Sequence, residues 1–106
     1  MTEYDLTTES GLDKAKKLIK EFLKSNPIVM VYELLDDCLN GNNPEKQSKA
    51  VSEIIKAAAA SDVEEIKITL ENLKGIKILI PIDDAKADAH VGVDGKLHLH
   101  VKFPKK

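Results

Sequence analysis

The stretch VEEIKITLENLKGIKILIPID, residues 63–83, decides the class of fold. Aliphatic residues alternate with polar ones over 66–70, and isoleucines return at every second position over 76–82. Successive side chains in a strand point to opposite faces, so strict alternation is the pattern of a strand with one buried side. The stretch therefore predicts two strands joined by a short loop that contains Gly75.

A helix over residues 63–73 is the alternative for the first half of this stretch. Its apolar residues also recur at helical spacing, Ser61 with Glu64 matches a capping box, and Gly75 is suited to a helix C-terminus. The β-branched run IKIT favours the strand. The helix is kept as the alternative.

Upstream of this stretch the apolar residues recur at three and four positions, which predicts helices. The first helix opens at Ser10 or Gly11 and ends before Pro27, because the residue before a proline disfavours the helical conformation. The second runs from Pro27 to about Leu39 and the third from 44 to 60. Proline suits the first position of the second and third helices, since its missing N–H would have no partner there.

Downstream, the segment HVGVDGKLHLH, residues 90–100, predicts a hairpin around Asp94-Gly95. A three-residue loop, Asp94-Gly95-Lys96, sorts the side chains so that one face of the hairpin is wholly apolar, with Val93 opposite Leu97. A shift by one residue would mix apolar and polar side chains on each face. We therefore expect the three-residue loop.

This register gathers the histidines on the other face of the hairpin. It places His90 opposite His100 and Asp88 opposite Lys102, with His98 diagonal to the pair. Opposed side chains in an antiparallel pair lie roughly 5 Å apart at Cβ. The three imidazoles are therefore expected to form one cluster.

Together these patterns predict an α+β fold in which three N-terminal helices pack on one face of a four-stranded antiparallel β-meander. Residues 1–9 are expected to form a flexible N-terminal arm, and residues 10–104 a single α+β domain. A chain of 106 residues has the length of one ordinary domain.

The composition argues against several classes of protein. All 16 basic residues are lysine, the net charge is −2 and there is no tryptophan, which argues against nucleic-acid binding. The longest apolar run, Ile28–Tyr32, is too short to cross a membrane. The opening residues MTEYDLTTES contain no apolar signal segment, and the single cysteine, Cys38, cannot form an internal disulfide. We expect a cytoplasmic protein.

The histidine cluster carries the only specific chemical hypothesis. His90, His98 and His100, with water or Asp88 in the fourth position, could hold zinc, because zinc takes nitrogen and oxygen ligands in a tetrahedral array. The ordinary alternative is that alternation alone puts polar residues on this face. No other cofactor is expected.

The function predicted from these features is that of a small non-catalytic binding or regulatory module. Its working surface would be the sheet face opposite the helices, used for a protein partner or for homodimerisation, because a sheet covered by helices on one side leaves the other side free. The residues expected on that surface are His90, His98, His100, Leu79 and Pro81. The alternative is a metal-binding or histidine-based hydrolytic enzyme that uses the three histidines.

Overall fold

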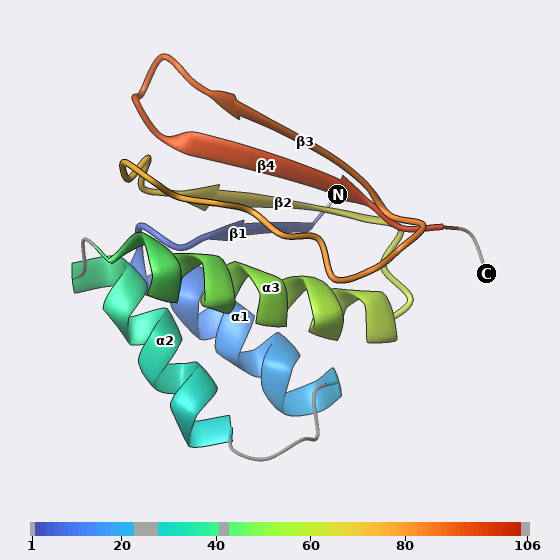
Figure 1. The fold of residues 1–106 in the computed structure, drawn as a ribbon. Helices are drawn as coiled ribbons and strands as arrows, with labels where there is room; N and C mark the ends of the chain where they lie inside the picture. The colour runs from blue at the N-terminus through green and yellow to red at the C-terminus, as the bar shows by residue number, and fades with distance from the viewer. Residues whose placement is uncertain (1, 23–27, 41–42, 105–106) are drawn as a thin grey trace.

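The chain folds into one layer of helices packed against one mixed β-sheet (Figure 1). The computed structural model describes residues 2–22, 28–40 and 43–104. In chain order the elements are β1 (Thr2–Asp5), α1 (Glu9–Phe22), α2 (Ile28–Asn40), α3 (Pro44–Ala60), β2 (Glu65–Leu70), β3 (Lys86–Val91) and β4 (Leu97–Lys102). The α+β class and the placement of three helices on one sheet face are confirmed.

The sheet is not the antiparallel meander that the sequence predicted. Its strand order is β1-β2-β4-β3. β1 precedes all the helices and pairs parallel to β2, whereas β2 with β4 and β3 with β4 are antiparallel. The helices therefore lie inside a crossover from β1 to β2, which a parallel pair requires.

β1 is formed by residues that the sequence analysis placed in the N-terminal arm. Tyr4 and Leu6 point into the core and are 4% and 1% exposed. The N–H of Leu6 donates to the carbonyl of Thr69 on β2 at 2.8 Å, which extends the pairing one residue beyond the strand. Burial of these two side chains is what holds the segment in the sheet.

The predicted strand over residues 76–82 is also wrong. This part of the chain has no strand pairing, and it runs alongside α3 on the helix side of the sheet, in the orange part of the chain in Figure 1. Ile76, Ile78, Ile80 and Ile82 are partly buried against the core. The alternation was therefore a true signal of a half-buried segment, but among the described residues no neighbouring strand pairs with its backbone.

A buried glutamine directs the start of this connection. Gln47 on α3 is 2% exposed, and its Nε2 donates to the carbonyl of Glu71 at 2.7 Å. A buried amide without a partner costs about 1–3 kcal/mol, so this bond ties the end of β2 to α3.

The helix ends follow from capping. The α3 bounds confirm the prediction, and Asn43 accepts hydrogen bonds from the N–H groups of Glu45 and Lys46 at 3.1 Å each. α1 begins at Glu9, slightly before the predicted start, and the hydroxyl of Thr8 accepts from the N–H of Gly11. The predicted start of the second helix at Pro27 lies outside the described residues. No helix among those described combines the length and the apolar character that crossing a membrane requires.

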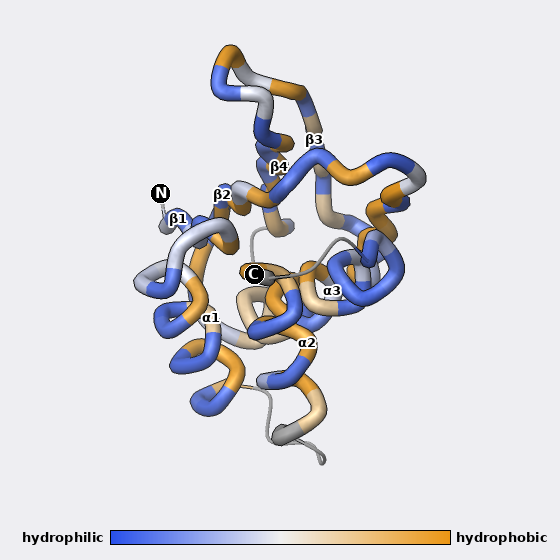
Figure 2. Tube along the Cα trace, turned by 90° about the vertical axis from the view of Figure 1, so that its left-hand side faces the viewer, coloured by the Kyte–Doolittle hydropathy of each residue, from blue (hydrophilic) through white to orange (hydrophobic). Residues whose placement is uncertain are grey.

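The core lies between the helices and the strands β1, β2 and β4. β2 alternates buried and half-buried residues, and β4 does the same as far as Val101, whereas all six residues of β3 are exposed. Figure 2 shows the far end of the β3–β4 hairpin standing away from the helices. β3 is therefore an edge strand that the helices leave uncovered.

Candidate functional site

The side of the sheet that faces away from the helices is almost entirely polar. We call it the polar face, and its residues are Glu3, Asp5, Glu65, Lys67, Thr69, Lys86, Asp88, His90, His98, His100 and Lys102. The buried aliphatic residues of β2 and β4 occupy the alternate positions. Alternation thus placed all three histidines on the correct face.

The pairing of the hairpin differs from the prediction by two residues. His90 lies opposite His98, and Asp88 lies opposite His100, in place of the predicted His90–His100 and Asp88–Lys102 pairs. A shift of two leaves every side chain on its own face, so the hydrophobic pattern could not distinguish the two registers.

Turn geometry selects the observed register. The loop is Val93-Asp94-Gly95, closed by hydrogen bonds of 3.0 Å from Gly95 N–H to the Gly92 carbonyl and from Gly92 N–H to the Lys96 carbonyl. Gly95 has φ +78°, the left-handed conformation that the third residue of such a loop adopts. The predicted loop placed Gly95 in the middle position and Val93 in the sheet, whereas Val93 is fully exposed in the turn.

The strand register arranges the polar face in three rows across the strands. The first row, from β1 to β3, is Asp5, Thr69, His98 and His90. The second row is Glu3, Lys67, His100 and Asp88. The third row is Glu65, Lys102 and Lys86. Carboxylate, ammonium and imidazole groups are mixed along the rows, so the face has no strong field of one sign.

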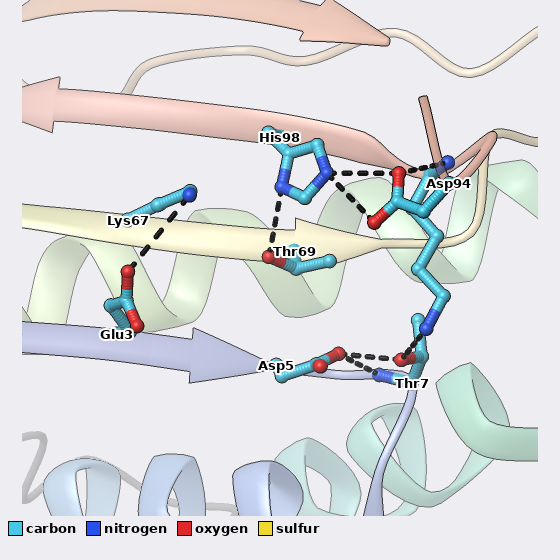
Figure 3. A network of polar contacts seen from close by, with 8 residues as sticks. Glu3, Asp5, Thr7, Lys67, Thr69, Asp94 and His98 are labelled. Carbon is cyan, nitrogen blue, oxygen red and sulfur yellow. Dashed lines mark hydrogen bonds and ion pairs between the residues drawn. The ribbon is translucent and has the colours of Figure 1, made fainter. Parts of the chain in front are cut away.

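His98 is held at both ring nitrogens (Figure 3). Its Nε2 lies 3.1 Å from Oδ1 of Asp94, and its Nδ1 lies 3.2 Å from Oγ1 of Thr69. The neutral ring satisfies both partners when Nε2–H donates to the carboxylate and the threonine hydroxyl donates to Nδ1. The ring of His90 stacks on that of His98, with centroids 5.4 Å apart.

Asp94 links the hairpin loop to the polar face. The backbone N–H of Lys96, and next the imidazole of His98, hold the pKa of Asp94 below its usual range. The Lys96 side chain crosses to β1, where its Nζ donates to Oγ1 of Thr7 at 2.9 Å. Thr7 follows β1, so the loop is tied to the far edge of the same sheet (Figure 3).

The third histidine has a different partner. Nε2 of His100 lies 2.9 Å from Oε2 of Glu65 on β2. His100 also lines a shallow open hollow of about 270 Å³ between β3 and β4. The other residues of its lining are Lys86, Ala87, Asp88 and Lys102.

The arrangement does not assemble the predicted zinc ligands. Within the described ranges, no group of three or more His, Cys, Asp or Glu residues is placed to hold a metal ion. Zinc would need nitrogens about 2.0–2.1 Å from one point. Here His98 and His100 are engaged by carboxylates on different elements, Asp94 in the turn and Glu65 on β2.

The contacts of His98 also give the order carboxylate, imidazole, hydroxyl, which acyl-transfer enzymes use. Such an enzyme further needs backbone N–H donors aimed at the developing oxyanion. Thr69 lies on β2, an interior strand whose backbone is paired with β1 on one side and β4 on the other. The backbone N–H groups of β2 beside this hydroxyl are used in strand pairing, so they do not supply such donors.

Leu79 and Pro81 do not join the histidines. Leu79 is 73% exposed and lines a mainly apolar hollow of about 420 Å³ with Pro44, Ser48 and other residues of α3. Pro81 lies two residues further along the same connection, which has no strand pairing with the hairpin that carries the histidines. The structure thus divides the predicted partner-binding residues between two surfaces.

Sequence reasoning missed several residues of the polar face. Asp94 was assigned only to the turn, although it contacts a histidine four positions later. Glu3 and Asp5 were missed because β1 was taken as an arm. The alternation of Tyr4 and Leu6 with these acidic residues was the signal that could have found them.

Comparison with family models, with curated proteins and with solved structures finds no match to this chain.

Proposed function

We propose that this protein is a small non-catalytic binding module that docks a partner protein on its polar face. The observation that carries the proposal is that a whole sheet face is left free by the helices while several of its side chains are already held by cross-strand contacts. These contacts join Glu3 with Lys67, Thr69 with His98, and Glu65 with His100. Binding then costs little side-chain ordering, since these rotamers are set before the partner arrives.

The charge pattern supports a protein partner of matched pattern. The polar face offers four carboxylates against three ammonium groups, mixed within its rows. Such a face discriminates by position of charge, since like charges placed opposite each other are unfavourable. It lacks the single-sign field that a nucleic acid or an anionic membrane would select.

The same face is a poor site for a homodimer. Its residues include no aliphatic side chain and no Phe, Tyr or Trp, and Leu79 lies elsewhere. Stable homodimer interfaces are more apolar than the rest of the surface. We therefore assign the polar face to a different protein.

The test compares two matched charge reversals. Lys102→Glu lies on the polar face and Lys17→Glu on α1, and both lysines are exposed. Immobilised parent and variants are used to capture proteins from extract of the native cells, with quantitative mass spectrometry as the readout. We expect partners that the parent and Lys17→Glu retain and that Lys102→Glu loses several-fold, with circular dichroism unchanged in both.

Hydrogen exchange of the captured complex locates the contact. Protection should rise on β2 and β4. A captured set that Lys102→Glu leaves intact, or protection confined to the helices, would contradict the proposal.

The alternative function, metal binding by the three histidines, can be tested by adding zinc. Addition of Zn²⁺ to the metal-free protein should leave the melting temperature and the imidazole NMR signals of His90, His98 and His100 unchanged, because the rings do not converge. A rise in melting temperature together with shifts of all three signals would restore the metal hypothesis.

A further inference from the structure

The two edges of the sheet differ in how far the rest of the chain covers them. At the β1 edge the outward carbonyls are already occupied, since Lys14 Nζ donates to the Glu3 carbonyl at 3.0 Å and Thr8 donates to the Asp5 carbonyl. At the other edge lies β3, whose six residues are all exposed. An uncovered edge strand is a template for another strand.

The hydrogen-bonding pattern of the hairpin shows which backbone groups of β3 are not used in pairing with β4. The N–H of Gly92 donates to Lys96 across the hairpin, so alternation turns the even-numbered residues of β3 toward β4. The N–H and C=O groups of Ala87, Ala89 and Val91 therefore point to the open edge. In the described part of the chain no strand lies beyond β3 to accept or donate to them.

The side chains at this edge suit a close backbone approach from a second strand. Ala87 and Ala89 are small and exposed, and Val91 is 53% exposed although it lies on the face that the core occupies further along the sheet. On the other face the strand carries Lys86, Asp88 and His90.

We propose that β3 pairs antiparallel with β3 of a second copy of this chain, about a two-fold axis at Ala89. A two-fold pairing requires that if one residue faces another, the reverse contact is also made. Centred on Ala89, the pairing joins Ala89 to itself and Ala87 to Val91. All three are outward-facing residues, so they form hydrogen-bonded pairs that supply about six N–H···O bonds.

The polar side chains favour this register, because an imidazole N–H can donate a hydrogen bond to a carboxylate. With Ala89 at the axis, Asp88 of each copy faces His90 of the other, and this contact occurs twice. With Asp88 at the axis, two carboxylates would face each other across a close pair, which is unfavourable. With Ala87 at the axis, only residues 86–88 of the strand would remain paired within β3.

The dimer formed in this way has a continuous sheet. Residues that face each other in an antiparallel pair lie on the same side, so the polar faces of the two copies join and the helices of both lie on the opposite side. This inference uses the edge of the sheet and does not depend on partner docking at the polar face.

The first experiment measures mass against concentration. The parent protein should form a dimer in light scattering as its concentration rises. Ala89→Pro removes an outward N–H that β4 does not use, and proline is tolerated at such edge positions. We expect this variant to stay monomeric with an unchanged circular dichroism spectrum. A parent that is monomeric at every concentration would overturn the proposal.

The second experiment tests the register by cross-linking. Ala89→Cys should form a disulfide between copies under mild oxidation, because the Cα atoms of a hydrogen-bonded pair lie about 5.5 Å apart, within disulfide range. Ala87→Cys is the matched control, since it faces Val91 of the other copy. Cross-linking of Ala87→Cys as strong as that of Ala89→Cys would refute the register.

A charge exchange gives an independent check that does not rely on proline or cysteine. Asp88→Lys should weaken the dimer, because it removes the carboxylate that accepts from the imidazole of His90. Adding His90→Asp should restore the dimer, because a lysine then faces a carboxylate at both contacts. Failure of the double variant to recover dimer contradicts the Ala89 axis.

The two proposals fail separately. Lys102→Glu should alter partner capture and leave the dimer intact, whereas Ala89→Pro should abolish the dimer and leave capture intact.

Discussion

Replacement of Gly11 by alanine should weaken the attachment of β1, although Gly11 lies inside α1, where alanine is ordinarily the better residue. A Cβ added to Gly11 would lie 1.9 Å from the carbonyl oxygen of Asp5 and 2.5 Å from its carbonyl carbon. Both are backbone atoms at the end of β1, so no side-chain rotation can relieve the contact. The absence of a side chain at Gly11 allows the helix to lie directly on the strand.

The magnitude follows from two opposing effects. Alanine gains about 1 kcal/mol over glycine in a helix interior. Widening 1.9 Å to the 3.0 Å that real Cβ contacts reach requires a backbone shift of about 1.1 Å. Overpacking that forces backbone movement costs about 1–3 kcal/mol, occasionally more, and a contact with backbone lies at the upper end. We expect a net loss of about 2 kcal/mol.

Urea unfolding and hydrogen exchange together check this result. With an m value of about 1–2 kcal/mol/M, the urea midpoint should fall by roughly 1–2 M. The amide of Leu6, which donates to Thr69 on β2, should lose protection before the core does. Ser10→Ala is the matched control, one residue away and exposed, and should change stability by less than about 0.5 kcal/mol. A Gly11→Ala protein as stable as the parent, with Leu6 still protected, would refute the steric argument.

Three further predictions concern single side chains. Asn43→Ala removes the cap of α3 and should cost about 1 kcal/mol in urea unfolding; an unchanged midpoint would contradict the cap. Burial, aided by a neighbouring carboxylate, raises the pKa of Cys38 to about 12, so thiol labelling near neutral pH should proceed only as fast as unfolding, and labelling at the rate of a free thiol would be inconsistent with burial. The bonds from Lys96 and His98 lower the pKa of Asp94, so Asp94 stabilises the fold above its ordinary value of 3.8, and this contribution is lost as the pH falls through the lowered pKa. Asp94→Asn should therefore be less stable than the parent at neutral pH, with the difference vanishing in acid; parallel pH profiles would exclude this.

Local patterns were sufficient for the helices and for the faces of the strands. The third helix was predicted with its bounds, because Asn43-Pro44 is a complete start signal within two residues. The sides taken by His90, His98 and His100 were also predicted, since the period of a strand assigns each residue to one face.

The register of the hairpin could not be predicted in the same way. Pairing His90 with His98 in place of His100 keeps every residue on its face, so the free energy of burial does not distinguish the two registers. The observed register is set by the left-handed conformation of Gly95 and by the hydrogen bond from Lys96 N–H to the Asp94 side chain at 3.0 Å. These are properties of the closed turn.

The sheet order depended on contacts between distant segments. The sequence pattern within residues 2–5 or 76–82 does not predict which strand, if any, will form hydrogen bonds with their backbones. Residues 2–5 became a strand because α1 and β2 left room for Tyr4 and Leu6, with Gly11 admitting the close approach. The isoleucines of 76–82 have the stronger strand pattern, yet they lie beside α3 without strand pairing.

The sequence by itself thus determined the class of fold, the helices and the inward or outward direction of the residues in β2, β3 and β4, because these depend on periodicity and on caps within a few residues. Only the tertiary structure decided which strands are neighbours, which segment joins the sheet, and which partners each histidine meets. Those outcomes depend on backbone hydrogen bonds and close contacts between residues far apart in the chain, and the order of side chains along one segment does not encode them.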